Sequence, residues 1–198
     1  MELTKEKEVR AAILELIKRL SKEQLATIKP DAVATEIEKK RDLRNDHWVS
    51  SILLTTPKAS VCFRVHFASE VGKQLAIDAF GGSVQEFSLE EVQDYLKEYC
   101  NIVVGRAKQF LVNSDDDKGG SHKTWLPEVK PAYDEFGVLQ DEPSQVIEEM
   151  WWKLEWEKQE MVLYAKVKVL AGFSMQSIKE LKKQTIISVV DDGSVELF

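Results

Sequence analysis

Two carboxylates and a carboxamide recur at helical spacing near the middle of this 198-residue sequence, at Asp94, Glu98 and Asn101. At about 100° per residue, these side chains and Gly105 fall within about 60° of one another on one helix face. Glu98 and Asn101 are one turn apart, so their polar groups can reach a common point in space. Gly105 would let another backbone approach closely. We predict that this face carries the chemistry; a solvated face of accidental composition is the alternative.

A long amphipathic helix over residues 88 to 112 is expected to position these groups. Ser88 followed by Glu91 fits a capping box, in which each side chain bonds a first-turn backbone donor of the other residue. Apolar residues then recur at steps of three, four and seven, the period of a helix with one buried side. They are Leu89, Val92, Leu96, Val103, Ala107, Phe110 and Leu111. The opposite side is rich in Asp, Asn and Gly, which helix stability does not explain, because Gly alone costs about 1 kcal/mol relative to Ala.

The remaining periodicities predict two hairpins and a further helix. Residues 48–55 and 60–67 alternate between apolar and polar types, and so do 150–156 and 161–169. Such alternation is typical of strands with one buried face. A helix is predicted over 69–80. Two hairpins with helices between them imply an α+β fold, in which an antiparallel sheet carries its helices on one side.

Both ends of the chain are expected to extend this domain. An N-terminal helical extension is assigned to residues 1–45, and the main domain to residues 46–198. The extension is predicted to hold three helices, the second capped by Ser21 and the third opening at Pro30. A helix followed by a strand is expected between residues 174 and 190. Packing against the sheet is the preferred interpretation of the N-terminal helices, and partner recognition is second.

Composition argues against several classes of partner. The net charge is −7 and the isoelectric point is about 5.2, whereas nucleic-acid-binding proteins gain affinity through clustered Lys and Arg. No apolar run approaches the roughly 18 residues of a membrane helix, and the N-terminus leads into charged residues. We therefore expect a cytoplasmic protein with no nucleic-acid or membrane partner.

The cysteines and histidines offer little chemistry of their own. Cys62 and Cys100 lack the spacing of a zinc site or a disulfide framework, and Cys100 falls on the apolar side of its helix. His47, His66 and His122 are scattered, without companions at ligand spacing. We expect ordinary reduced thiols, a structural role for His66, and no metal bound by this chain.

The helix with its polar face resembles the phosphatase helix of the CheC/CheX family of bacterial chemotaxis proteins. The resemblance rests on Glu98-x-x-Asn101, with Asp94 four residues before it and Gly105 four residues after it. It covers residues 46 to about 170, and Pro127 resembles the proline that the family carries downstream of the asparagine. A second Glu-x-x-Asn pair is not present, so the sequence is most similar to the single-site CheX type.

This resemblance implies a phosphatase that hydrolyses the aspartyl phosphate of a CheY-like response regulator. Asn101 would hold the attacking water in line, since phosphoryl transfer is catalysed mainly by positioning and electrostatics. Glu98 would form a salt bridge with the active-site lysine of the regulator, and Asp94 would add to an acidic rim. Gly105 and Pro127 would support docking. The Mg²⁺ ion belongs to the regulator, so this chain would bind no cofactor itself.

Two other functions remain open at this stage. The first is a non-catalytic interaction module of a two-component signalling pathway, for which the Tyr99-Cys100 pair leaves room. The second is a small-molecule-binding α/β domain with a pocket between the tryptophan-rich hairpin and the N-terminal helices. If Trp151 is exposed on the second face of the sheet, a homodimer formed through the sheet is attractive, because CheX-type members of the family pair in that way.

Overall fold

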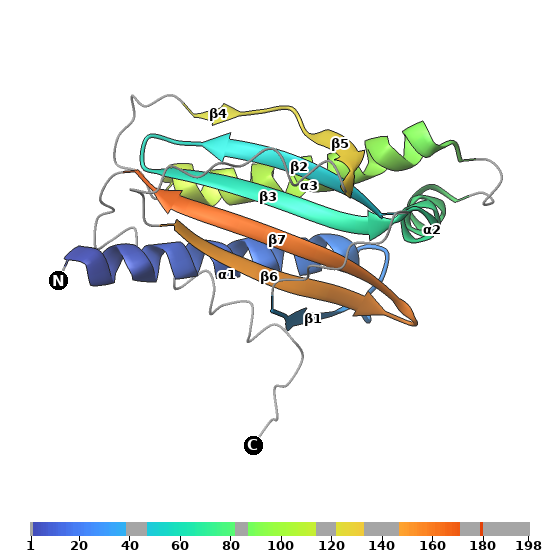
Figure 1. Ribbon diagram of the computed structural model, residues 1–198, viewed down its shortest axis with the longest axis horizontal. Helices are drawn as coiled ribbons and strands as arrows, with labels where there is room; N and C mark the ends of the chain where they lie inside the picture. Colours follow the sequence, from blue (N-terminus) through green and yellow to red (C-terminus); the bar gives the residue numbers. More distant parts are fainter. Residues whose placement is uncertain are drawn as a thin grey trace, which may run out of the picture.

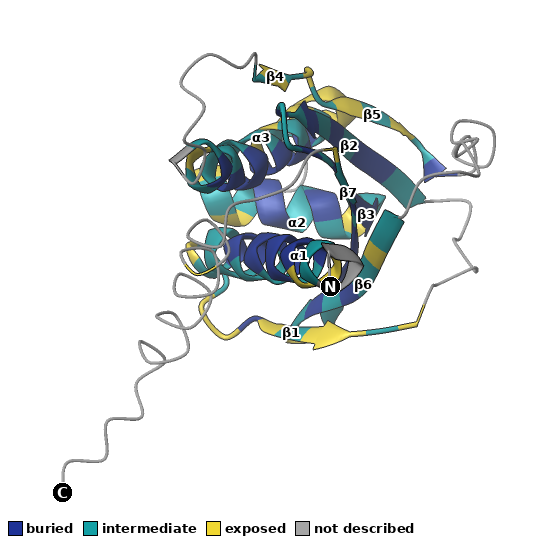
Figure 2. Ribbon diagram, turned by 90° about the vertical axis from the view of Figure 1, so that its left-hand side faces the viewer, coloured by how far each residue is buried: buried dark blue, intermediate teal, exposed yellow. Residues whose placement is uncertain are grey.

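An antiparallel sheet with helices on one of its faces makes up the described part of the chain (Figures 1 and 2). The computed structural model describes residues 2–38, 47–81, 87–113, 122–132, 147–170 and 179. The helices are α1 (Glu2–Ala26), α2 (Ser69–Phe80) and α3 (Leu89–Asn113). The strands are β1 (Val33–Glu36), β2 (His47–Thr55), β3 (Ala59–Ala68), β4 (Lys123–Thr124), β5 (Glu128–Pro131), β6 (Ile147–Trp156) and β7 (Gln159–Val169).

Two long hairpins form the centre of the sheet, as the alternating sequence predicts. The strand order is β1-β6-β7-β3-β2-β4, and β5 also pairs with β2. Hairpins β2–β3 and β6–β7 join through β3 and β7, with Phe63 opposite Ala165. Figure 2 shows α1, α2 and α3 together on one side of this sheet. The predicted α+β fold with two hairpins and one-sided helices is therefore confirmed.

The hydrophobic core lies between the sheet and the helices. Alternate residues of β3 face the helices and are fully buried, as are their neighbours on β6 and β7. They include Val61, Phe63, Val65, Phe67, Trp152, Leu154, Leu163 and Ala165. This arrangement follows from the strand period of two, which sends every second side chain to the same face.

The first helix is longer than the sequence predicts. Ser21 was expected to cap a second helix, but α1 runs without a break from Glu2 to Ala26. The Ser21 hydroxyl donates to the Lys18 carbonyl at 2.7 Å and accepts from Trp152 Nε1 at 3.1 Å. With its hydroxyl bonded back to the preceding turn and buried against the sheet, Ser21 no longer acts as a cap. The prediction of a helix start at Ser21 is wrong.

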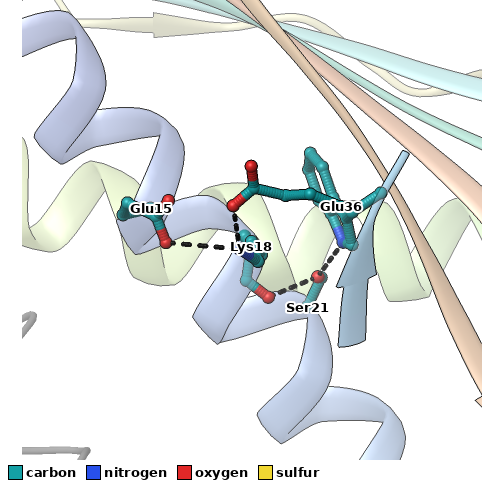
Figure 3. A network of polar contacts seen from close by, with 5 residues as sticks. Glu15, Lys18, Ser21 and Glu36 are labelled. Carbon is teal, nitrogen blue, oxygen red and sulfur yellow. Dashed lines mark hydrogen bonds and ion pairs between the residues drawn. The ribbon is translucent and has the colours of Figure 1, made fainter. Parts of the chain in front are cut away.

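A strand replaces part of the third predicted N-terminal helix. Residues Val33 to Glu36 form β1, which pairs with β6 so that Glu36 lies opposite Trp152. Lys18 on α1 forms ion pairs with Glu36 and, at 3.6 Å, with Glu15, so that α1 and β1 are tied together (Figure 3). The edge of β6 decides this outcome. Pairing with β1 satisfies backbone N–H and C=O groups of both strands, and the two strands become neighbours only in the folded chain.

Several terminal predictions lie outside the described residues. The remainder of the third predicted helix, beyond residue 38, and the helix and strand expected between 174 and 190 belong to this group, with Lys179 alone described. The domain boundary at residue 45 stays a prediction. Within the described residues, α1 contributes Ile13, Leu16 and Ile17 to the same hydrophobic core as the sheet and α3.

The second face of the sheet carries no described helix, and Trp151 lies on it. The indole of Trp151 is half-buried, with ring centroids 4.6 Å from Tyr164 and 5.6 Å from His66. Neighbouring side chains therefore cover part of the surface on which the expected sheet-mediated homodimer depended. The homodimer stays a prediction.

Gly72 allows α2 to approach both the sheet and α3. A Cβ atom at this position would lie 2.8 Å from Val92 Cγ1 and 2.9 Å from Phe67 Cδ2, closer than real Cβ contacts. We expect Gly72→Ala to lower the free energy of unfolding by about 1 to 3 kcal/mol, because this overpacking outweighs the roughly 1 kcal/mol gain in helix propensity. Urea denaturation measures the difference; equal or higher stability would show that Phe67 and Val92 move aside easily.

Candidate functional site

Helix α3 begins with the predicted capping box. The Ser88 backbone N–H donates to Glu91 Oε2 at 2.7 Å, and the Glu91 N–H donates to Ser88 Oγ at 3.3 Å. The Ser88 N–H and the Ser88 hydroxyl, which donates at 2.8 Å, both bond to the Glu91 carboxylate and hold its pKa below the usual value. The reciprocal bonds satisfy first-turn donors that have no partner within the helix, so the start of α3 is fixed locally.

The inner face of α3 is anchored at its centre. The Ser50 hydroxyl on β2 donates to the Leu96 carbonyl at 3.3 Å, and Cys100 Sγ lies 3.3 Å from Ser50 Oγ. On the side facing α1, the Tyr99 hydroxyl donates to the Ser21 carbonyl at 2.7 Å. Tyr99 and Cys100 are thus buried in the core and leave the outer face clear. The predicted buried stripe is confirmed except at Leu89, which is 40% exposed at the first helical position, and at Phe110, which is half-buried against the core.

The outer face of α3 brings Glu98 and Asn101 together. Asn101 Nδ2 donates to Glu98 Oε2 at 3.3 Å; the glutamate is exposed and the asparagine is half-buried. Asp94, one turn earlier, is exposed and pairs with Lys97, whose Nζ lies 2.8 Å from Asp94 Oδ1. This face therefore presents a carboxylate and a carboxamide within hydrogen-bonding distance, on a helix whose other side is fixed in the core.

Gly105 lies one turn beyond Asn101 on the same face. A Cβ atom built at Gly105 would meet no atom within 4 Å in the part of the chain that the structure describes. No contact within those residues therefore requires a glycine here. The role predicted for Gly105, close approach by the backbone of another molecule, stays a prediction.

Pro127 lies at the edge of the sheet beside α3, in a β-bulge. Thr124 of β4 is opposite Leu54, whereas Glu128 of β5 is opposite Ser51, so three residues of this edge face two of β2. One extra residue in one strand defines a bulge, and proline is tolerated there because no ladder donor is lost. The strand that follows Pro127, β5, contacts α3, and the docking role of Pro127 stays a prediction.

Other candidate reactive groups are placed away from this face. Burial raises the pKa of the Cys100 thiol to about 12, so it stays protonated and serves as a packing group. Burial also lowers the pKa of His66 to about 3, which keeps this histidine neutral on the second face of the sheet. Among the described residues, no group of His, Cys, Asp and Glu side chains could hold a metal ion. None of the described helices is long and apolar enough to cross a bilayer.

A cavity of about 330 Å³ lies between α1, β1 and β6, where the small-molecule alternative expects a pocket. Its acidic lining residues Glu36, Glu148 and Glu149 already have protein partners. Lys18 pairs with Glu36, Arg10 Nε donates to Glu148 at 3.3 Å, and the Tyr164 hydroxyl donates to Glu149 at 3.0 Å. These bonds account for the carboxylates as structural groups, so the cavity adds little support for a ligand site.

Solved structures match this chain, whereas family models and curated proteins do not. No family model and no curated protein matches this chain. The chemotaxis protein CheX from Vibrio vulnificus superposes with a TM-score of 0.59 and 15% identity, over 79% of this chain and 99% of that chain. A CheC-like superfamily protein from Shewanella sp. PV-4 gives a TM-score of 0.59 and 16% identity, over 79% and 97% of the two chains. The protein has the CheC/CheX fold.

The structure of the CheX–CheY–BeF3–Mg²⁺ complex from Borrelia burgdorferi contains a chain that is similar to this one. The TM-score is 0.53 and the identity is 11%, over 80% of this chain and 96% of that chain. Identities this low establish the CheC/CheX fold alone. The structural matches agree with the resemblance that was based on the residues of α3, and they cover most of the chain.

Two features of the site were missed in the sequence. Lys97 pairs with Asp94, although a spacing of three residues on a helix is the ordinary signal for such a pair. Leu126, next to Pro127, is 86% exposed. The available signal was a pair of large apolar residues, Trp125 and Leu126, directly before this proline.

Proposed function

We propose that this protein binds a phosphorylated CheY-like response regulator through the outer face of α3 and hydrolyses its aspartyl phosphate. The supporting observation is the pair formed by Glu98 and Asn101, whose polar groups lie 3.3 Å apart on the exposed side of a rigidly held helix. The CheC/CheX fold, which includes a CheX solved together with CheY, supports the class of partner. The closeness of these two side chains is the geometric requirement for joint action on one phosphorylated residue.

Asn101 is assigned the role of orienting water. A carboxamide offers both a donor and an acceptor, so it can fix a water molecule without removing its proton. Its Nδ2 group is held by Glu98, which leaves the Oδ1 acceptor for a water proton. An acyl phosphate already has a good leaving group, and positioning of the attacking water supplies much of the remaining acceleration.

Glu98 is assigned the role of docking against a cation of the regulator. Its carboxylate is exposed, and Oε2 accepts a bond from the neutral Asn101 amide. The second oxygen, Oε1, can accept a charge-assisted bond from a lysine of the partner. Asp94 differs, because Lys97 already neutralises it in part. On this proposal Asp94 contributes to the acidic rim more weakly than Glu98. The Mg²⁺ ion would be supplied by the regulator.

Glu98→Gln is expected to weaken docking more than turnover. Removing the charge while keeping the shape should raise KM for the phosphorylated regulator by about ten-fold, since a charge-assisted contact contributes about 1.5 kcal/mol. The rate at saturation should change by less than about three-fold. Asp31→Asn is the matched control, because Asp31 is exposed beside β1 at the opposite edge of the sheet. A fall in the saturated rate with KM unchanged would contradict the docking role.

A non-catalytic interaction module is the second candidate. Glu98 and Asn101 bond to each other in the free protein, so they already satisfy part of their hydrogen-bonding capacity without a substrate. The same face could then bind a regulator without accelerating hydrolysis. Binding of the activated regulator with no change in its dephosphorylation rate would identify this function.

A further inference from the structure

A lysine lies two turns beyond Asn101 on the outer face of α3. Gly105 follows Asn101 by four residues, and Lys108 follows it by seven. Steps of four and seven return to the same face of a helix, one and two turns further along. All three residues are half-buried. They form one continuous stripe that leads from Asn101 towards the C-terminal end of α3.

Helix stability does not account for Lys108. The other basic residues of α3 are paired, Lys97 with Asp94 at 2.8 Å and Arg106 with Glu23 at 2.5 Å. Among the described residues, no carboxylate forms an ion pair with Lys108. The helix dipole acts on charges in the last turn, and the last turn of α3 has no basic residue. A lysine with solvent as its partner is common on a helix, so its position relative to Asn101 decides what it can do.

Gly105 leaves an open space between Lys108 and Asn101. A Cβ atom built at Gly105 would meet no atom within 4 Å among the described residues. The Cα atoms of Asn101 and Lys108 lie about 10.5 Å apart along the helix axis, with Gly105 between them. A longer side chain at position 105 would project into this interval, because residues three and four apart are neighbours on a helix surface. The glycine therefore leaves room for a group of another molecule beside the Asn101 amide.

The ammonium of Lys108 and the amide of Asn101 can both reach this space. Long helical side chains lean towards the preceding turn, which for Lys108 is the turn of Gly105. The stem of lysine spans about one turn of 5.4 Å, so its ammonium comes within about 5 Å of the level of Asn101. Asn101 Nδ2 is bonded to Glu98, so Oδ1 lies on the side of the amide away from Glu98. One phosphoryl group can bridge such an interval, since charge-assisted bonds are about 2.8 Å long.

The charges along α3 favour an anion at the Lys108 end of the stripe. On the N-terminal side of Asn101, Asp94 and Glu98 are exposed carboxylates, which repel a phosphoryl group. On the C-terminal side, the ammonium of Lys108 attracts one, and its half-buried position makes the attraction stronger than in bulk water. This polarity fits a partner that presents a cation to Glu98 and a phosphoryl group to the space above Gly105.

We infer that Gly105 and Lys108 form a phosphoryl-binding subsite, in which the Lys108 ammonium bonds an oxygen of the regulator's aspartyl phosphate above Gly105. This inference rests on the proposed function and adds the group that holds the phosphate. In hydrolysis, the oxygen of the water held by Asn101 bonds to phosphorus while the bond from phosphorus to the aspartate oxygen breaks. The aspartate leaves as a carboxylate, and both water hydrogens stay with the released phosphate. A cation at the phosphoryl oxygens stabilises the charge on them in the transition state.

The test compares charge variants in the single-turnover decay of a phosphorylated CheY-like regulator from the same organism. Lys108→Gln should lower the saturated rate by about ten-fold or more, because it removes a charge-assisted bond to the phosphoryl group. Lys108→Arg keeps the charge and should stay within about three-fold of the wild-type rate.

Lys7→Gln is the matched control, because it removes the same charge from an exposed position of α1. Lys7 lies about 18 Å along α1 from Arg19, whose guanidinium is over the Phe110 ring of α3. This separation exceeds the Debye length of about 8 Å at physiological salt, so the saturated rate should change by less than about two-fold.

A variant at Gly105 tests the space itself. Gly105→Gln fills it with an uncharged side chain and should lower the saturated rate by about ten-fold, because the phosphoryl group is displaced from the Asn101 amide. The melting temperature should not fall, since no described atom lies within 4 Å of the new Cβ and glutamine is a better helix former than glycine.

The possible results separate this inference from the proposed function. If the wild-type protein accelerates dephosphorylation and either Lys108→Gln or Gly105→Gln does so equally well, the subsite is wrong and the proposed function stands. Equal losses in Lys108→Gln and Lys7→Gln would also overturn the subsite, because the effect would follow net charge. So would a loss in Lys108→Arg as large as that in Lys108→Gln. If the wild-type protein accelerates no dephosphorylation, the proposed function fails and the inference fails with it.

Discussion

Asn101→Ala is expected to abolish stimulated dephosphorylation of the regulator, with a rate loss of about 100-fold or more. The side chain lies on the outer face of α3, within 3.3 Å of Glu98, where it can hold a water molecule in line with the phosphorus atom. Misplacing a reacting group by about 1 Å can cost a factor of about 100, and alanine removes the positioning group altogether. The measurement is the decay of radiolabelled phosphoregulator under single-turnover conditions.

The fold should tolerate this change. Alanine gains about 0.5 kcal/mol in helix propensity over asparagine, and the exposed bond to Glu98 is worth a similar amount. These opposing terms should leave the free energy of unfolding unchanged within about 0.5 kcal/mol. A loss of rate therefore cannot be attributed to unfolding, and urea denaturation provides the check.

Two further variants sharpen the result. Asn101→Asp keeps the shape but places a second carboxylate 3.3 Å from that of Glu98, so it too should lose the activity through repulsion of the phosphate. Gln109→Ala removes an exposed carboxamide two turns further along α3 and should keep the activity. Full activity in Asn101→Ala would exclude water positioning by this residue and leave the non-catalytic module as the better function.

Trp152→Ala is expected to produce the largest loss of stability, about 3 to 5 kcal/mol. Trp152 is fully buried, and its ring stacks on Phe63 with centroids 6.1 Å apart. Its indole N–H also donates to the Ser21 hydroxyl at 3.1 Å, joining the sheet to α1. Deletion of a large buried aromatic side chain leaves a cavity, and that cost adds to the lost transfer free energy. Equilibrium unfolding in urea measures the loss.

The adjacent tryptophan provides the matched control. Trp151 points to the second face of the sheet and is half-buried, so Trp151→Ala should cost about half as much or less. Trp152→Phe keeps most of the packing but loses the bond to Ser21, and we expect a loss of about 1 to 2 kcal/mol. Equal losses in the two alanine variants would contradict the assignment of the core to one face of β6.

Local patterns determined the elements that build the site. The capping box at Ser88 and Glu91 fixes the start of α3, and the spacing of its apolar residues decides which side is buried. Both signals act within a few residues, so the sequence expresses them directly. The meeting of Glu98 with Asn101 follows from the same helical period. The two hairpins are equally local, because each pairs strands that are neighbours in the sequence.

The tertiary structure alone decided the N-terminal elements. Ser21 has the residue type and spacing of a cap, but burial against Trp152 and its bond to the Lys18 carbonyl keep α1 continuous. Likewise, Val33–Glu36 becomes a strand because the edge of β6, more than 100 residues away in the sequence, supplies its hydrogen bonds. Such contacts outweigh helix propensities, which differ by less than about 1 kcal/mol among most residues.

The edge of the site was also decided by long-range pairing. Both β4 and β5 pair with β2, and the shift of register between them creates the bulge in which Leu126 is exposed. A sequence near Pro127 cannot show this shift, because it depends on which residues of β2 each short strand meets. The sequence by itself therefore determined α3 and its polar face, whereas the tertiary structure decided what lies beside that face, since register is a property of paired strands and not of either strand alone.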